Sequence, residues 1–426
     1  MADREEGTMK QRLRYLFTVL AILVIFGAGF FAGQFSPTAS AFQQLQQETD
    51  SPQLARLEQI WNLVHTEYVT QPLDDEALIS GAINGMLEVL DDQHTSYMPP
   101  GEFELFNSTI EGSYTGIGAE VETRDDKLYI VSPFEGSPAE AAGLQPGDEI
   151  VQVDDTPITE FEDPLTAITL VRGPAGEAVT LKIRRDAQTF DIEVVRAEIP
   201  LISASGEMRD DGIGYVRVSD FGSNTTGQLR EALEPIMESD PQGLILDLRG
   251  NPGGSLNTAI EVTSEFIGDG TVMVEEWGNG TTYAYEAETG GLATNPDLPL
   301  IVLVDGGSAS ASEIVAGAIQ DRGRGQLLGE TTYGKGTVQN WHDLGPENGG
   351  VRITVAKWLT PDENWVHEQG LTPDVEVIPG AADQAAQRDI QLESAVNLLL
   401  GFPAPIPTDS PLSNGGAWHG TLPVAQ

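Results

Sequence analysis

PLIVLVDGGSASASEI, at residues 299–314, joins an apolar strand to a helix through a run of very small residues. A turn of this kind exposes a side chain and leaves the first N–H groups of the helix free to bind an oxyanion. Most serines at a helix start are caps. Ser308, Ser310 and Ser312 are too many for one cap, so a nucleophilic serine stays open beside the capping role.

Strands and helices alternate on both sides of this stretch, from about residue 203 onward. Helices are expected up to Ser239, from Leu256, from Ala311 and near 383–400. Strands are expected at GIGYVRVSDF (212–221), GLILDLRG (243–250), GQLLGE (325–330) and VRITVAKWL (351–359). Apolar strands that alternate with helices predict βαβ units and a sheet that is largely covered.

Residues 112–198 have a different sequence pattern, in which short β-like segments are separated by glycine and proline. The runs are KLYIVSP (127–133), DEIVQVDD (148–155), AVTLKIRRD (178–186) and TFDIEVVRAEI (189–199), with short helical pieces at SPAEAAGL (137–144) and DPLTAITLVRG (163–173). This pattern predicts a separate compact module of about 85 residues.

The N-terminal region predicts export. Residues 15–33 form an uncharged run of 19 positions that follows Lys10, Arg12 and Arg14. This run nearly crosses a bilayer, and the positive-inside rule places the rest of the chain outside. Its length favours an uncleaved anchor, although Ala39-Ser40-Ala41 offers the cleavage site of a signal peptide.

Two amphipathic helices are expected next, at residues 52–68 and 78–90, and their apolar stripes are expected to form core rather than a partner surface. At the other end, residues 402–426 are rich in Pro, Gly and Ser and predict a flexible tail.

Composition narrows the function classes. The 426 residues carry a net charge of −44, which argues against binding nucleic acid or anionic lipid. The chain has no cysteine, which excludes disulfides, thiolate zinc sites and cysteine nucleophiles. No HExxH or similar ligand cluster occurs, so no metal is expected.

A nucleophilic serine needs a base, and Lys335 is the candidate. None of the five histidines lies in a triad signature. Glycines flank Lys335, and no acid follows it within four residues, so a buried amine there can stay neutral. The stretch nearly matches a phosphate-binding P-loop, but Gly336 replaces the required hydroxyl and the following residues are β-like, so this alternative fails.

The turn DLRGNPGG (247–254) ends another buried strand. Its glycine pair suits either a tight turn or a backbone N–H that serves as an oxyanion donor beside the Ala311 N–H.

Together, GSASASEI (307–314), GKGTVQ (334–339) and DLRGNPGG (247–254) resemble the carboxyl-terminal processing peptidases, tail-specific serine proteases that carry a PDZ domain. The likeness extends from about residue 52 to about 380 and includes GLTPD (370–374). Several motifs agree in order and spacing.

The resemblance implies roles for individual residues. Ser310 corresponds to the nucleophile, Lys335 to the general base, and Gln339 to the residue that orients the amine. The oxyanion donors correspond to the N–H groups of Ala311 and Gly254, with Gly253 as the alternative. Asp321 matches a structural aspartate of the family.

The resemblance also implies a PDZ domain, whose carboxylate-binding loop corresponds to Thr115, Gly116, Ile117 and Gly118. Successive N–H groups there hold a C-terminal carboxylate while the peptide adds as a strand. SPA (137–139), AGL (142–144) and PGD (146–148) complete that pattern. The implied fold is a multidomain α/β (α+β) protein, with a crotonase-like protease core, an inserted PDZ domain and an N-terminal helical segment.

The domain boundaries follow from these patterns. They are 1–14 for a cytoplasmic N-terminus, 15–33 for an anchor or signal peptide, 34–51 for a linker, 52–111 for a helical domain, 112–198 for the PDZ domain, 199–401 for the peptidase core and 402–426 for the tail.

The function expected is that of an exported serine endopeptidase, membrane-anchored or secreted, with its catalytic domain extracytoplasmic (periplasmic or extracellular). It recognises apolar C-termini of proteins or peptides and uses no cofactor. The terminal helices are candidates for homo-oligomer contacts. The alternative is a non-catalytic, membrane-tethered PDZ scaffold that binds exported C-termini.

Overall fold

The computed structural model describes residues 52–124, 127–161, 167–186, 188–345 and 347–403. The chain divides into two units, residues 1–79 and 80–426, which are described separately. The segments predicted as cytoplasmic N-terminus, anchor or signal peptide and linker, and nearly all of the tail, lie outside the described residues. No helix among the described residues is long and apolar enough to span a bilayer.

Helix α3 (Pro52–Glu67) lies in the first unit. Helix α4 (Asp75–Glu88) begins in the first unit and ends in the second unit. Both helices were expected, but the expectation that their apolar stripes form core is wrong. Neither helix has a buried residue, and Leu54 and Leu57 are each more than half exposed. Two short helices offer too little surface to cover their own apolar faces.

The module expected at 112–198 forms a sheet with strand order β3-β4-β5-β7-β8, and β6 pairs with β5. A separate pair, β2 with β9, precedes and follows it in the chain. The elements are β2 (Ser113–Gly116), β3 (Ala119–Arg124), β4 (Lys127–Pro133), α6 (Pro138–Ala141), β5 (Glu149–Val153), β6 (Thr156–Pro157), α7 (Ile168–Val171), β7 (Ala178–Arg185), β8 (Gln188–Val195) and β9 (Ala197–Pro200). The module has its own hydrophobic core, built around Leu128, Ile130, Leu181 and Ile183.

The second half of the chain is built on a six-stranded sheet of order β10-β11-β12-β15-β16-β19. Strands β11, β12, β15, β16 and β19 pair in parallel, and β10 adds antiparallel at one edge. The elements are β10 (Ala204–Met208), β11 (Ile213–Val218), α8 (Thr225–Glu238), β12 (Gly243–Asp247), α9 (Leu256–Ser264), β15 (Leu300–Val304), α10 (Ala311–Asp321), β16 (Gln326–Gly329), β19 (Val375–Glu376), α11 (Ala381–Ala385) and α12 (Ile390–Leu399). The expected α/β class is confirmed.

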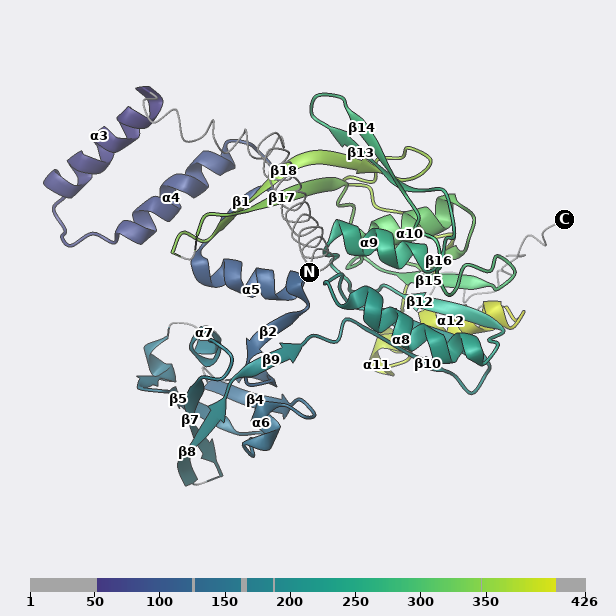
Figure 1. Cartoon of the computed structure of the whole chain (residues 1–426), viewed down its shortest axis with the longest axis horizontal. Helices are drawn as coiled ribbons and strands as arrows, with labels where there is room; N and C mark the ends of the chain where they lie inside the picture. Colours follow the sequence, from purple (N-terminus) through teal and green to yellow (C-terminus); the bar gives the residue numbers. More distant parts are fainter. Residues whose placement is uncertain (1–51, 125–126, 162–166, 187, 346, 404–426) are drawn as a thin grey trace, which may run out of the picture. The chain divides into compact units, whose positions relative to one another are not determined.

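Helices cover both faces of this sheet, as the apolar strands predict. Val216, Leu246 and Val302 point to the face covered by α8, α9 and α10. The alternate residues, among them Ile245 and Ile301, point to the face covered by α12 (Figure 1). Because successive side chains of a strand face opposite sides, this burial accounts for the uninterrupted apolar runs in the sequence.

A second sheet, absent from the sequence-based expectation, has strand order β1-β18-β13-β14, and β17 also pairs with β18. Its strands are β1 (Ser96–Met98), β13 (Thr271–Trp277), β14 (Thr282–Glu286), β17 (Thr337–Asp343) and β18 (Gly350–Leu359). All its pairings are antiparallel. Lys335 lies two residues before the start of β17, so this sheet positions the candidate base.

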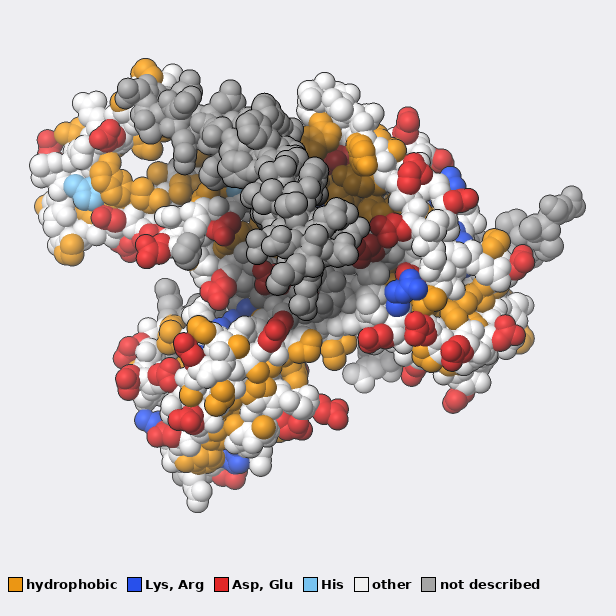
Figure 2. Space-filling view, viewed as in Figure 1, with side chains coloured by type: hydrophobic (Ala, Val, Ile, Leu, Met, Phe, Trp, Pro, Cys, Tyr) orange, Lys and Arg blue, Asp and Glu red, His pale blue; other side chains and the backbone are white. Residues whose placement is uncertain are grey.

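The acidic composition is visible on the surface. On the face in Figure 2, aspartate and glutamate side chains are spread over the described parts and are not gathered into one patch. Their mutual repulsion favours a protein that stays dispersed and avoids polyanions.

Candidate functional site

The serine turn lies between β15 and α10, where it was expected. Ser308 and Ser312 are fully buried, and their hydroxyls donate to the carbonyls of Leu248 and Asn251 at 2.9 Å each. Ser310 between them is only partly buried and has φ 57° and ψ −113°, a backbone conformation that is strained for a serine. Of the three serines, Ser310 is therefore the one that keeps solvent-exposed surface.

One buried carboxylate joins the serine turn to the lysine loop. Glu313 Oε2 accepts hydrogen bonds from Ser310 N at 2.8 Å and Lys335 N at 2.9 Å. Its Oε1 accepts from Thr332 Oγ1 at 2.6 Å and Gly334 N at 2.7 Å. Glu313 has no solvent-exposed surface. The Glu313 carboxylate thus accepts hydrogen bonds from four donors, and these bonds fix the backbones of both loops relative to each other. Sequence reasoning missed this role because the partners are about 20 residues apart.

Replacing Glu313 by glutamine is expected to lower the free energy of unfolding by about 3 kcal/mol, because the amide cannot accept at both of its ends. Denaturant unfolding of the purified protein measures this change. Asp321→Asn on the same helix is the matched control. Asp321 is only partly buried and accepts one backbone hydrogen bond, from Asp362 N at 3.0 Å, so its loss is expected to stay below about 1 kcal/mol. Equal stability of Glu313→Gln and the native chain would contradict the linking role.

The Lys335 amine lies in an environment that favours its neutral form. Burial, and next the positive charge of Arg352, lower the pKa of Lys335 to about 8, although Glu313 and Asp92 act in the opposite direction. The loop carbonyl of Lys335 accepts from Trp358 Nε1 at 2.8 Å, which holds the loop against β18. An amine with this pKa serves as a base near neutral pH.

The candidate base and the candidate nucleophile are not hydrogen-bonded to each other in the structure. Within the described residues, Lys335 Nζ forms no hydrogen bond with Ser310 Oγ, and none with Gln339. The Gln339 amide instead donates to Thr337 Oγ1 at 2.8 Å and Thr354 Oγ1 at 3.3 Å. The two loops are joined through Glu313, while the two candidate side chains are not hydrogen-bonded to each other.

His94 is a neighbour of Lys335 that sequence reasoning did not identify. It is buried, and its Nε2 has no hydrogen-bond partner in the described chain. Burial and then the charge of Lys335 lower the pKa of His94, so the imidazole stays neutral. His94 and His367 line a cavity of about 490 Å³, with their ring centroids 6.1 Å apart. No sequence motif joins these histidines to the lysine loop.

The turn after β12 lies directly against the serine turn. Gly253 has φ 104°, and a Cβ placed on it would lie 2.9 Å from Ser310 Cβ and 3.0 Å from Ala311 N. The Gly253 N–H donates to Asn251 Oδ1 at 2.9 Å. Gly254 pairs with Phe221 in an isolated bridge, and its own N–H forms no hydrogen bond within the described residues. Ala311 is the first residue of α10, where helix N–H groups lack partners in the helix.

The predicted peptide-binding loop lies at the edge of the module's sheet. Thr115 and Gly116 belong to β2, which pairs with β9. The carbonyls of Ile117 and Gly118 accept hydrogen bonds from Ala139 N at 2.8 Å and Phe134 N at 2.9 Å. The chain then enters β3, an edge strand of the sheet. An edge strand can pair with one further strand, which is the mode of binding predicted for a peptide.

No group of three or more histidine, aspartate and glutamate side chains in the described residues is placed to hold a metal ion.

Three family models match the chain. Peptidase family S41 matches residues 212–377, a PDZ domain matches 129–185, and the activating protease CtpB N-terminal domain matches 23–100. The first two matches fall on the six-stranded core and on the module with the edge strand β3.

Curated relatives are similar over most of their length. The carboxy-terminal processing protease CtpA of Bacillus subtilis is 37% identical over 371 residues, which cover 86% of this chain and 78% of the relative. CtpB of the same organism is 34% identical, covering 82% and 75%. The carboxy-terminal-processing protease of Bartonella bacilliformis is 37% identical, covering 83% and 82%.

Among solved structures, the photosystem II D1 C-terminal processing protease is 30% identical, with a TM-score of 0.45 and coverage of 74% of this chain and 86% of that one. The identity to the curated relatives extends through the PDZ module and the core that carries the serine and lysine loops. The chain therefore belongs to the carboxy-terminal processing proteases, serine-type proteases of family S41 that carry a PDZ domain.

Proposed function

We propose that this chain is an exported endopeptidase that cleaves proteins through a Ser310–Lys335 dyad, after its PDZ domain has captured an apolar C-terminus. The observation that carries the proposal is the arrangement around Glu313, which holds a strained, accessible serine and a lysine of depressed pKa on adjoining loops. Export rests on the sequence of residues 15–33 and is part of the proposal.

The reaction begins when Ser310 Oγ attacks the scissile carbonyl carbon while neutral Lys335 accepts the hydroxyl proton. The negative oxygen of the tetrahedral intermediate is stabilised by the N–H groups of Gly254 and Ala311. Gly254 is the better donor of the glycine pair because the Gly253 N–H is already bonded to Asn251. Lysine then returns the proton to the leaving amine, and an acyl-enzyme forms.

Water completes the reaction by attacking the acyl carbon, with Lys335 again accepting a proton and returning it to Ser310. Because the two side chains are not hydrogen-bonded in the structure, the proposal includes a rotation of the lysine side chain onto Ser310 when substrate binds. Gln339 then orients the amine in the productive state. Hydrogen bonds of catalytic groups commonly tighten only in the substrate complex.

The experiment that tests this function uses purified protein and unfolded β-casein. Mass spectrometry is expected to find new peptides. A fluorophosphonate probe, which phosphonylates serine nucleophiles with loss of fluoride, is expected to modify Ser310 and stop the release of these peptides. Casein that binds but remains intact would instead support a PDZ scaffold without peptidase activity.

The depressed pKa of Lys335 predicts a pH profile. At pH 7 roughly a tenth of the amine is neutral if its pKa is about 8. Peptide kcat/KM is therefore expected to rise about tenfold per pH unit below 8 and to level off above about 9. Initial rates across pH 6 to 10 in a constant-ionic-strength buffer measure this. A rate that is flat below pH 8 would contradict a lysine base.

A further inference from the structure

The turn that carries Gly253 and Gly254 is held from both of its sides. On one side, Asp305 Oδ1 accepts from Gly250 N at 2.8 Å and from Gly307 N at 2.9 Å. Asp305 thereby ties this turn to the serine turn. On the other side, Arg249 N donates to Asp247 Oδ1 at 3.0 Å, which fixes the second residue after the strand.

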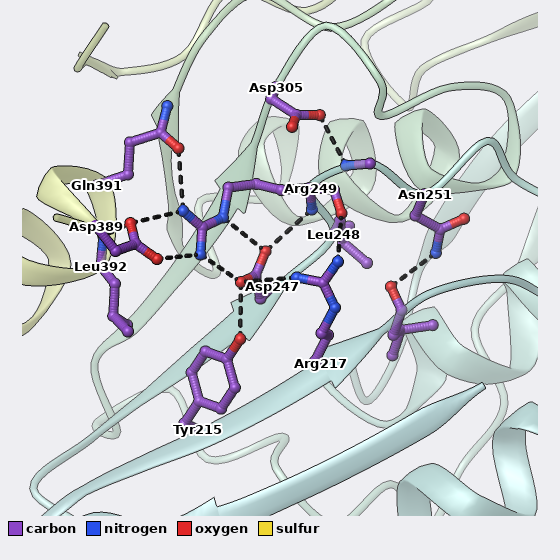
Figure 3. A network of polar contacts seen from close by, with 12 residues as sticks. Tyr215, Arg217, Asp247, Leu248, Arg249, Asn251, Asp305, Asp389, Gln391 and Leu392 are labelled. Carbon is purple, nitrogen blue, oxygen red and sulfur yellow. Dashed lines mark hydrogen bonds and ion pairs between the residues drawn. The ribbon is translucent and has the colours of Figure 1, made fainter. Parts of the chain in front are cut away.

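The Arg249 side chain extends this anchoring to a distant part of the chain (Figure 3). Its Nε and Nη2 donate to Asp247 at 2.9 and 2.6 Å. Its Nη1 and Nη2 donate to the two carboxylate oxygens of Asp389 at 2.8 and 2.9 Å, and Nη1 also donates to Gln391 Oε1 at 3.1 Å. Asp389 and Gln391 belong to the start of α12, about 140 residues further along.

The groups around Arg249 leave it little freedom to move. Asp247 is fully buried and also accepts from Tyr215 OH at 2.8 Å, while Arg217 Nη2 donates to the Arg249 carbonyl at 3.1 Å. The Arg249 side chain is 15% exposed. Burial raises the pKa of Asp389, but hydrogen bonds from Arg249 outweigh it, so the pKa is lowered and the carboxylate is charged at neutral pH. A planar guanidinium gripped by two carboxylates has a defined orientation.

From these contacts we infer that Asp389 is a positioning residue for catalysis, which acts through Arg249 to hold the turn of Gly253 and Gly254 against the serine. The helix at the end of the core thereby contributes to the oxyanion site without touching substrate. This inference rests on the proposed function, because it assigns the turn the role of oxyanion donor. A misplacement of such a donor by a fraction of an ångström weakens transition-state binding more than substrate binding.

Asp389→Asn isolates the contact. Asp389 is also the N-cap of α12 and accepts from Leu392 N at 3.0 Å, and asparagine caps helices equally well. The variant thus keeps the cap and removes the charge and one of the two acceptors for Arg249. The matched control is Glu393→Gln, which removes one charge from the same helix and affects only the ion pair of Glu393 with Arg388 at 3.3 Å.

The test measures kcat and KM with a peptide substrate, and the affinity of a peptide boronic acid. Boron accepts the serine oxygen and becomes a tetrahedral anion, with one oxygen in the oxyanion site. For Asp389→Asn we expect kcat to fall and the boronate Ki to rise, each about tenfold, with KM changed less than twofold. Glu393→Gln is expected to match the native chain in all three. Thermal unfolding shows that each variant is folded at the assay temperature.

A lower melting temperature of Asp389→Asn with native kcat and Ki would overturn the inference, since the ion pair would then be only structural. A raised KM with unchanged kcat would overturn it too. Ser310→Ala, assayed in parallel, separates this failure from that of the proposed function. If Ser310→Ala is inactive while Asp389→Asn is unchanged, the inference alone fails. An active Ser310→Ala would remove the function on which both rest.

Discussion

Replacing Lys335 by methionine is expected to lower kcat by a factor of about 10⁴ or more, with little change in the overall fold. Methionine matches the length and apolar stem of lysine but cannot accept the serine proton. Because Ser310 and Lys335 act as one unit, Ser310→Ala and the double variant should lose about the same factor as the single lysine variant. Peptide hydrolysis assays at pH 8, with product detected by mass spectrometry, measure all three.

The control for this substitution is Lys357→Met. Lys357 is exposed on the neighbouring strand β18, with its amine 4.4 Å from the centre of the Trp365 ring. The loss of this surface cation–π contact is expected to lower the free energy of unfolding by about 1 kcal/mol. It removes no group that takes part in the reaction, so kcat is expected to stay within twofold. Lys335→Met that retains more than a hundredth of the native kcat would contradict the assignment of the base.

The second large effect is expected for Gly253→Ala, which should lower kcat/KM by about 10² to 10³. The added methyl group would lie 2.8 Å from the carbonyl oxygen of Ala309 and 2.9 Å from Ser310 Cβ, in a residue with φ 104°. The turn must therefore move away from the serine, and an oxyanion donor lost in this way costs a factor of this size. Steady-state kinetics of the folded variant, checked by circular dichroism, measure it.

Gly250→Ala in the same turn separates crowding from backbone strain. Gly250 also has a positive φ, 67°, but a Cβ there would meet no atom within 4 Å. Alanine at this positive φ is expected to lower the free energy of unfolding by about 1–2 kcal/mol. The kcat/KM of this control is expected to fall less than about threefold. If both variants lose activity equally, strain and not the approach to Ser310 explains the loss.

Local patterns predicted the parts of the fold that are local in origin. The apolar run before the serine turn forms β15, and the helix starts at Ala311 as expected, because both are set by neighbouring residues. The β-like reading of the residues after Lys335 is confirmed as β17, which supports the rejection of a phosphate-binding loop. The region expected as one helix near 383–400 is two, α11 and α12.

Features that depend on distant partners were not predictable. Glu313 reads as an ordinary N3 residue of a helix, and its bonds to the lysine loop exist only in the folded chain. The contact between Arg249 and Asp389 spans about 140 residues. The apolar stripes of α3 have the periodicity of core helices, yet periodicity does not say what covers them. The role expected of Gln339 by resemblance remains a prediction.

The most direct test of a neutral lysine base is an NMR titration of the Lys335 side chain. The chain has only five lysines, so uniform labelling with ¹³C at the ε-carbon gives few signals, and Lys335→Arg identifies the one of interest. The titration uses Ser310→Ala to prevent self-cleavage. We predict a midpoint at about pH 8 for Lys335. A Lys335 midpoint at or above about 10.4, the ordinary pKa of lysine, would contradict the account.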